Sequence, residues 1–147
     1  MKVVIQRSKE SSVSINGEFY NKINKGFVIL VGFIDGDTEE DIDYIIKKII
    51  GLRIFDDENG VMNKNIIDVQ GEILSISQFT LYADTKKGNR PSYSKAMTGS
   101  LATEMYDLFN RKLNEFVSVK TGIFGSDMLV SIKNDGPVTI IIDSKNK

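Results

Sequence analysis

The sequence predicts an α+β domain built on a largely antiparallel, β-barrel-like sheet with two main helices. Short apolar segments with strand character recur along most of the chain, whereas only two well-separated segments carry apolar residues at helical spacing. An Asn-Gly pair between two strand-like segments also indicates a hairpin, which requires antiparallel pairing. The length of 147 residues suits one domain with a single substantial core, residues 1–147.

The first third of the chain is expected to form four strands. Val3–Arg7 reads as the first strand, and Ser12–Ile15 and Phe19–Ile23 flank Asn16-Gly17, the signal of a type I′ turn. Gly26–Phe33 is a continuous apolar run bounded by glycine, which is typical of a strand buried on both faces.

Two helices are expected. The first follows Asp37–Glu40, which supplies a cap and an acidic first turn, and the second starts with Ser100 as its N-cap. Apolar residues at helical spacing define the buried stripe of each: Ile42, Ile45, Ile46, Ile49 and Ile50 in the first, and Leu101, Met105, Leu108, Phe109, Leu113 and Phe116 in the second.

The remaining segments are expected to add strands and one long polar connection. The connection, Ala83–Ser94, carries three positive charges on Lys86, Lys87 and Arg90. A turn is expected at Asp57–Gly60. The further strands expected are Arg53–Phe55, Gly71–Phe79, Val117–Gly122, Met128–Asn134 and Val138–Asp143.

Composition excludes several classes of protein. A formal charge of −1 favours no nucleic-acid partner, so any such binding must come from a local basic patch. No apolar run approaches the roughly 18 residues of a membrane span, and the N-terminal apolar run is too short for a signal sequence. We therefore expect a soluble, cytoplasmic protein without a membrane partner.

The chain contains neither cysteine nor histidine. Disulfides, a thiolate nucleophile and thiolate metal sites are excluded, and so is any Ser-His-Asp or Cys-His mechanism. An enzyme with this composition must use hydroxyls, backbone groups, carboxylates, lysine or its own substrate. We expect no metal and no cofactor.

Polar side chains gather at the end of the strand expected over Gly71–Phe79. Ser77, Gln78 and Thr80 fall within four residues, and strand alternation would place Gln78 and Thr80 on one side and Ser77 and Phe79 on the other. Taken alone, this cluster is more simply read as a strand end whose hydroxyls bond neighbouring backbone groups.

Two other segments also have a plain structural reading. Asn134–Thr139 contains Asn, Asp, Gly and Pro in succession, which predicts a turn. A rigid Gly-Pro turn can also hold backbone carbonyl groups in fixed positions. Thr121–Met128 places Phe124 between glycines, where it can plug a loop or stack on a base.

Taken together, these motifs resemble the D-aminoacyl-tRNA deacylases. Residues 77–81 have the form Ser-Gln-x-x-Leu, and residues 134–139 have the form Asn-x-Gly-Pro-x-Thr. The likeness runs from Lys2–Arg7 to Thr139–Ser144 and includes chain length, helix placement and the Thr121–Gly125 segment. Ser126 and Tyr93 stand where the family pattern has Ala and Phe.

The resemblance implies a barrel-like α+β fold and a homodimer with active sites at the subunit interface. The implied reaction is hydrolysis of the ester that joins a D-amino acid, or glycine mischarged on tRNA-Ala, to the terminal adenosine of tRNA. The product is free tRNA, and rejection of L substrates provides chiral proofreading.

The resemblance also assigns site residues. Ser77, Gln78, Phe79 and Thr80 match one wall, where Phe79 and nearby N–H groups would bind the ester carbonyl as an oxyanion site. A cis Gly136-Pro137 bond, in a turn that includes Asn134 and Thr139 and is braced by Arg7, would enter the partner's pocket and bind the substrate amino group. Phe124 and Met128 match the adenine pocket.

Two mechanisms stay open. Thr80 could act as a nucleophile, although no obvious base lies near it in the sequence, or the tRNA 2′-hydroxyl could activate water. We favour the second. A competing function is a non-catalytic RNA-binding module on the same fold, which the basic loop and Phe124 also fit. A different small esterase is less well supported because no triad can be assembled.

Overall fold

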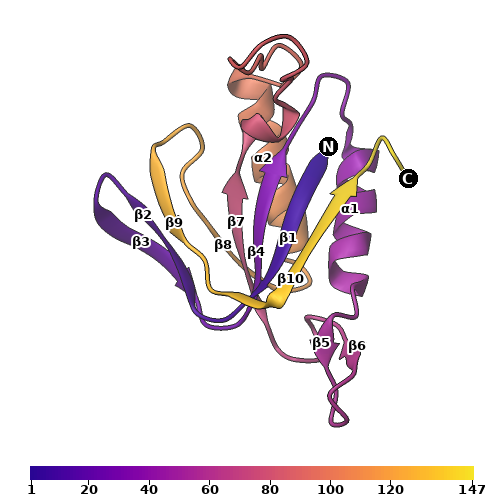
Figure 1. Cartoon of the computed structure of the whole chain (residues 1–147). Coiled ribbons are helices and arrows are strands. Elements are labelled where there is room, and N and C mark those ends of the chain that lie inside the picture. The colour runs from indigo at the N-terminus through magenta and orange to yellow at the C-terminus, as the bar shows by residue number, and fades with distance from the viewer.

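The computed structural model describes all 147 residues as two helices, a short 3₁₀ helix and ten strands (Figure 1). In chain order the elements are β1 (Lys2–Ser8), β2 (Ser11–Ile15), β3 (Glu18–Ile23), β4 (Gly26–Gly32), α1 (Glu39–Gly51), β5 (Phe55–Asp56), β6 (Met62–Lys64), β7 (Glu72–Ser77), η1 (Phe79–Tyr82), α2 (Gly99–Leu113), β8 (Ser118–Thr121), β9 (Met128–Ser131) and β10 (Asn134–Asp143).

The main sheet has five strands in the order β10-β1-β4-β7-β8, and a second sheet has the order β3-β2-β9. β1 pairs antiparallel with both neighbours, whereas the β4–β7 and β7–β8 pairs are parallel. The parallel pairs are possible because the connections between their strands are long. Each of these connections contains a helix that returns the chain to the same end of the sheet. The α+β class is confirmed, and the pairing is mostly antiparallel.

The expected barrel is not closed. β8 and β10 are edge strands of the main sheet and do not pair with each other, and the β3-β2-β9 sheet is separate. The term barrel-like therefore describes this fold only loosely, because two open sheets pack face to face instead of one sheet curling onto itself.

The two faces of the main sheet carry different cores. Helices α1 and α2 cover one face, where Phe27, Ile29 and Phe109 belong to a cluster of 21 buried residues. The β3-β2-β9 sheet covers part of the other face, where Val28 and Leu74 belong to a cluster of five buried residues. The alternation of Val28 and Ile29 to opposite clusters confirms that β4 is buried on both faces, as its unbroken apolar sequence predicts.

The hairpin between β2 and β3 forms as predicted. Asn16 has φ 52° and Gly17 has φ 79°, so both central residues occupy the left-handed region that a type I′ turn requires. The turn at Asp57–Gly60 is also present, and it joins β5 to β6, a strand that the sequence pattern did not indicate.

Several boundaries differ from those expected. The strand expected at Arg53–Phe55 is instead Phe55–Asp56, and the strand expected at Met128–Asn134 ends at Ser131. β7 ends at Ser77, and the residues after Gln78 form the 3₁₀ helix η1, so strand alternation does not set the directions of Phe79 and Thr80. Helix α2 begins at Gly99 with Thr98 as its N-cap, in place of Ser100. The turn expected at Asn134–Pro137 lies within the first part of the strand β10, where the pairing with β1 shifts register between Thr139 and Asn134.

Burial also differs from expectation on α2. Leu101 and Phe116, at the two ends of the expected stripe, are exposed, whereas Phe109 and Leu113 in its middle are fully buried. No helix of the structure has the length and apolar character that crossing a bilayer would need.

Candidate active site

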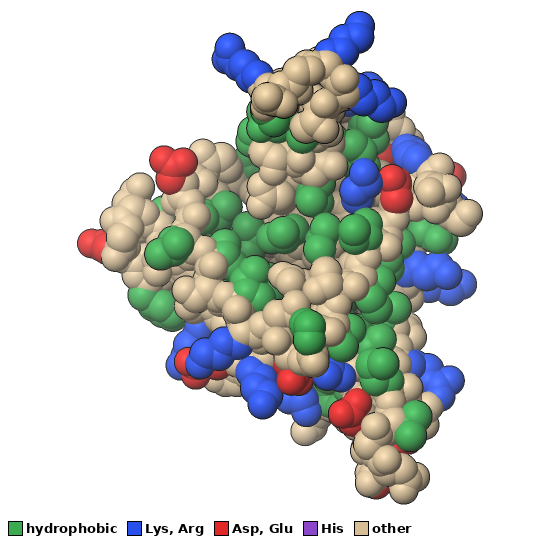
Figure 2. All heavy atoms as spheres, in the orientation of Figure 1, with side chains coloured by type: hydrophobic (Ala, Val, Ile, Leu, Met, Phe, Trp, Pro, Cys, Tyr) green, Lys and Arg blue, Asp and Glu red, His purple; other side chains and the backbone are tan.

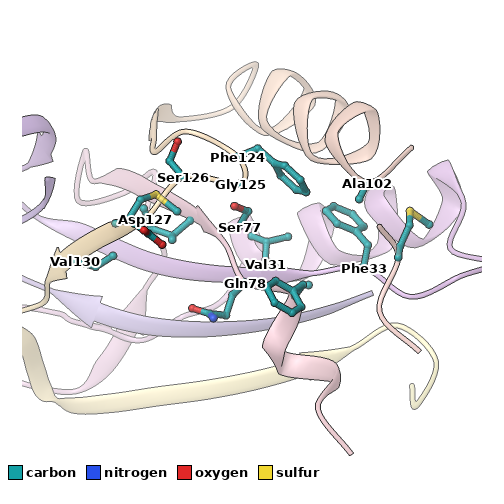
Figure 3. Close-up of a pocket in the computed structure, with 15 residues that line it drawn as sticks. Val31, Phe33, Ser77, Gln78, Ala102, Phe124, Gly125, Ser126, Asp127 and Val130 are labelled. Carbon is teal, nitrogen blue, oxygen red and sulfur yellow. The ribbon is translucent and has the colours of Figure 1, made fainter. Parts of the chain in front are cut away.

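A cavity of about 310 Å³ lies at the carboxyl end of β7, beyond the point where β8 leaves the sheet (Figure 3). Its walls come from β4, β7, the start of η1, helix α2 and the segment from Phe124 to Val130. The lining residues are Val31, Gly32, Phe33, Ile76, Ser77, Gln78, Phe79, Met97, Ala102, Phe124, Gly125, Ser126, Asp127, Met128 and Val130. Nine of these residues are hydrophobic, and Ser77, Gln78, Ser126 and Asp127 add polar side chains, so the cavity offers both apolar surface and hydrogen-bonding positions.

Of the four residues expected along one wall of the site, Ser77, Gln78 and Phe79 line this cavity and Thr80 does not. In Figure 3 the Ser77 side chain points toward the segment that carries Phe124, whereas Gln78 points to the opposite side of the strand. The Gln78 amide donates a hydrogen bond of 2.5 Å to the Thr80 hydroxyl. Thr80 is therefore bonded to a cavity residue without lining the cavity itself.

The backbone at Gln78 is held by β4. The Gln78 N–H donates a hydrogen bond of 2.7 Å to the Val31 carbonyl. Gly32, the next residue of β4, lies beside the Gln78 carbonyl. A Cβ atom at position 32 would stand 2.9 Å from that oxygen and 3.2 Å from the Leu81 Cβ atom. The glycine thus permits the close approach of η1 to the end of β4.

Phe79 presents its ring to solvent. Its side chain is 52% exposed, and its only aromatic contact is an edge-on arrangement with Tyr93 at 5.1 Å between ring centroids. A large apolar side chain left exposed at the mouth of a cavity is available to a ligand or to another chain.

The opposite wall is the segment between β8 and β9. Phe124 packs against Tyr106 of α2, with ring centroids 5.8 Å apart, and Met128 contributes to the cavity from the start of β9. The Met128 side chain packs closely on Gly122, where a Cβ atom would lie 2.4 Å from the Met128 sulfur and would displace that side chain. The two residues of the expected adenine pocket therefore both line the cavity on this wall.

A second polar cluster surrounds the start of β10. Arg7 Nε donates to the Asp135 carbonyl at 3.1 Å and Arg7 Nη1 donates to the Ile54 carbonyl at 2.8 Å. The Asn134 amide donates to the Thr139 hydroxyl at 3.0 Å. Between these contacts Gly136 and Pro137 are exposed, and the bond that joins them is cis, as the resemblance implies.

These two clusters lie far apart within one chain. β10 and β7 are separated by three strand spacings, or about 14 Å. Ser77 is level with Val31 and Val3, whereas Gly136 lies near Arg7, about four residues or 13 Å further along β1. The two motifs are therefore about 20 Å apart, and no single chain brings them into one pocket.

Few titratable groups lie near the cavity. Asp127 is the one carboxylate among the lining residues, and it is exposed. Burial raises the pKa of Tyr106, and burial together with Asp37 raises the pKa of Tyr82, so both phenols stay neutral. No group of three or more acidic, cysteine or histidine side chains is placed to hold a metal ion.

Comparison with known proteins identifies the family. A family model described as D-Tyr-tRNA(Tyr) deacylase matches residues 4–143. The chain belongs to this family. Members of the D-Tyr-tRNA(Tyr) deacylase family are hydrolases that act on the ester bond of aminoacyl-tRNA, so this chain is an enzyme of that class with tRNA as its partner.

Two solved structures share the fold of this family member. A protein described as c-Myc DNA Unwinding Element Binding Protein is 39% identical, with a TM-score of 0.92 over 97% of this chain and 98% of that one. A structure described as a probable eukaryotic D-amino acid tRNA deacylase is 16% identical, with a TM-score of 0.81 over 96% and 97%. The second likeness concerns the fold alone.

Several cavity residues of this deacylase-family chain were not identified from sequence. Phe33, Met97 and Ala102 face the cavity, but their apolar character in sequence marks them only as core. Asp127 is also new to the site. It lies 50 residues from Ser77, and no spacing rule connects an acidic loop residue to a strand end at that distance.

Proposed function

We propose that the protein hydrolyses the ester of D-aminoacyl-tRNA, and of glycine mischarged on tRNA-Ala, and that it rejects L-aminoacyl substrates. In this proposal residues 1–147 act as one deacylase domain in the cytoplasm, where aminoacyl-tRNA is used. The observation that carries it is the division of the site into two exposed halves about 20 Å apart.

A homodimer would bring the two halves together. Gly136 and Pro137 project from an edge strand, and the cavity of another copy offers a recess for them. Ile141 of β10, which is 65% exposed, shares a sheet face with Val4 and Leu30, and this face lies beside the β3-β2-β9 sheet. Figure 2 shows hydrophobic side chains across the middle of this side of the molecule. Such a surface suits an isologous contact between two copies.

The two halves have different tasks in this proposal. Phe124 and Met128 hold the terminal adenine, and the Ser77–Phe79 segment faces the ester. The carbonyl groups around Gly136, held by Arg7, accept hydrogen bonds from the substrate amino group and occupy the space that an L side chain would need. Discrimination then comes from steric exclusion of the wrong enantiomer, which requires no side chain that reacts.

The chemistry fits a site without histidine or cysteine. An aminoacyl ester is already activated, so position and fixed dipoles can supply much of the catalysis. The first turn of η1 leaves the N–H groups of Phe79 and Thr80 without partners inside that helix, and these can bind the developing oxyanion. Because the Thr80 hydroxyl lies outside the cavity and is bonded to Gln78, we favour water activated by the tRNA 2′-hydroxyl over attack by Thr80.

The direct experiment compares D-tyrosyl-tRNA with L-tyrosyl-tRNA and follows loss of the ester. Release of tyrosine from the D substrate only is expected, and glycyl-tRNA-Ala should also be cleaved. A D substrate whose terminal ribose lacks the 2′-hydroxyl should be hydrolysed far more slowly, and a full rate with that substrate would exclude the ribose-assisted route. Thr80→Ala should retain measurable activity, whereas a trapped acyl-enzyme on Thr80 would restore the nucleophile.

A non-catalytic RNA-binding module is the second candidate. The relative at 39% identity is described as a DNA-element binding protein, and the present chain carries Lys86, Lys87 and Arg90 on one exposed loop. Binding of both aminoacyl-tRNA enantiomers without turnover of either would favour this function over hydrolysis.

A further inference from the structure

β7 loses its neighbour just before it reaches the cavity. The last residue pair of the β7–β8 ladder is Ser75 with Thr121, and the Gly122 N–H adds one bond of 3.3 Å to the Ser75 carbonyl. Beyond that point β8 has turned away, yet β7 continues to Ser77. The outer edge of β7 therefore needs another partner over the residues that enter the candidate active site.

The Tyr106 hydroxyl occupies the position that β8 vacates. It donates a hydrogen bond of 2.7 Å to the Ser75 carbonyl, and the Ser77 backbone and the Asn110 side chain lie beside it. In a strand, the carbonyl of residue 75 and the N–H of residue 77 point to the same edge, so one hydroxyl can serve both. The Tyr106 hydroxyl thus takes the place of the backbone groups that a neighbouring strand would supply at this edge.

The surroundings make this contact a persistent one. Tyr106 is only 3% exposed, its ring lies against Phe124, and burial raises the pKa of its hydroxyl, which keeps the proton available for donation. Losing this hydrogen bond would leave the Ser75 carbonyl with only the 3.3 Å bond from the Gly122 N–H, and would remove the hydroxyl from beside the Ser77 backbone.

We propose that Tyr106 is a positioning residue for the deacylation reaction, acting through the β7 edge to hold the Ser77–Phe79 segment in place. This inference rests on the proposed function, since it takes the cavity as the place where the ester is cleaved. Tyr106 itself does not line that cavity and contacts no reacting atom. Its effect is on the location of the peptide groups that follow Ser75.

The test compares Tyr106→Phe with Tyr44→Phe, which removes a hydroxyl from α1 on a different helix. Tyr106→Phe keeps the ring and its contact with Phe124, so the variant loses one hydroxyl and no packing. With D-tyrosyl-tRNA we expect kcat to fall about tenfold and KM to stay within about twofold, because misplacement of reacting groups affects turnover more than binding. Tyr44→Phe should match the wild type.

Amide hydrogen exchange provides a second readout that does not depend on activity. In Tyr106→Phe the Ser77 amide should exchange about tenfold faster, whereas the amides of β4 should be unchanged. Asn110→Leu, which has a similar volume and leaves Tyr106 in place, should change both readouts in the same direction by a smaller factor. This variant keeps the test usable if Tyr106→Phe does not fold.

An unchanged kcat in Tyr106→Phe would overturn the proposal, and so would faster exchange spread evenly over the whole sheet, which indicates general destabilisation. If the wild type fails to cleave D-tyrosyl-tRNA, the proposed function is wrong. In that case the hydrogen-exchange data alone would still show whether the Tyr106 hydroxyl protects the Ser77 amide from exchange.

Discussion

Gly32 decides the path of the backbone at the mouth of the cavity. The chain turns from β7 into η1 directly above this residue, and the Gln78 carbonyl, the Leu81 Cβ atom and the Tyr82 ring all lie close to the place where a side chain would be. The absence of a side chain at Gly32 therefore leaves room for Gln78 and for the residues of η1 that pack there. Gly136 shows a similar restriction, because it has φ 123° and contacts Arg7.

Gly32→Ala is expected to reduce both deacylation and stability. The added methyl group must displace the backbone of η1, because the nearest atom at 2.9 Å is a carbonyl oxygen that cannot rotate away. We expect a loss of about 1–3 kcal/mol in the free energy of unfolding and a fall in kcat of about tenfold or more. Urea unfolding and steady-state deacylation measure the two effects.

Gly51→Ala is the matched control for this prediction. Gly51 ends α1, has no left-handed φ, and has no neighbouring atom within 4 Å of the position that a Cβ atom would take. Alanine at this helical position should therefore be neutral or raise stability by up to about 1 kcal/mol. Equal kcat losses in the two variants would contradict a specific role for Gly32.

At the scale of elements, α1 is held to the rest of the chain by a charged contact at its first turn. Asp41 is 7% exposed, accepts a hydrogen bond of 2.9 Å from the Thr38 N–H, and pairs with Lys145 at 2.8 Å. Burial of the Asp41 carboxyl raises its pKa, but hydrogen bonds from Lys145, Thr38 and Ser144 lower it, and the net pKa lies well below its ordinary value. The N-terminal cap and the C-terminal segment thus share one carboxylate.

This contact predicts a defined pH dependence of stability. A carboxyl whose pKa is lower in the folded state stabilises that state fully above its unfolded pKa of about 4 and loses the effect as the pH falls below that value. Asp41→Asn should therefore be less stable than the wild type at pH 7, and the difference should shrink between about pH 5 and pH 2.5. Urea unfolding at each pH measures the difference, and exposed Glu115→Gln should show no such convergence.

The loop between η1 and α2 concentrates positive charge next to the cavity. Lys86, Lys87 and Arg90 are exposed, and none of them forms an ion pair within the chain, whereas Lys95 pairs with Asp84 at 3.7 Å. Figure 2 shows lysine and arginine side chains that project from this end of the molecule. In a chain of net charge −1, this loop is a local concentration of positive charge, and we infer that it contacts the phosphates of the tRNA.

Replacing Lys86, Lys87 and Arg90 by Gln should raise KM for D-tyrosyl-tRNA with little change in kcat. Each lost phosphate contact should also reduce the slope of log KM against log salt concentration by about 0.7–0.9. Removing three charges from Lys47, Lys48 and Lys147, which lie on or beside α1, is the matched control. A salt dependence that both variants lower equally would point to net charge instead of this loop.

At the scale of the whole molecule, the register of the main sheet keeps the two motifs apart. Ser77 lies at one end of β7 and Gly136 at the opposite end of β10, three strands away. In an isologous pair of chains, the Ser77 motif of each copy can meet the Gly136 motif of the other copy, which gives two composite sites.

Complementation between two inactive variants tests this arrangement. Gln78→Ala and Gly136→Ala should each be inactive alone, because every site in either homodimer has one defective half. After the two are unfolded and refolded together, half of the dimers are mixed and hold one intact site out of two, so about a quarter of wild-type activity should return. No recovery, with mixed dimers verified by mass, would show that both halves act within one chain.

The sequence by itself determined most elements and the family. Hydrophobic periodicity, capping residues and the Asn16-Gly17 turn depend on contacts within a few residues, so β1 to β4, α1 and the body of α2 agree with expectation. The Ser77–Leu81 and Asn134–Thr139 motifs are likewise local in sequence, and the family assignment follows from them.

Only the tertiary structure decided what these motifs contact. Helix η1 forms where a strand was expected, and Gly32 of β4 leaves room for its backbone. The cavity also includes Phe33, Ala102 and Asp127, which come from three distant segments. Tyr106 reached the β7 edge for the same reason, across 31 residues. Such contacts depend on strand order and register, which arise from the packing of the whole chain and leave no periodic signal in the sequence.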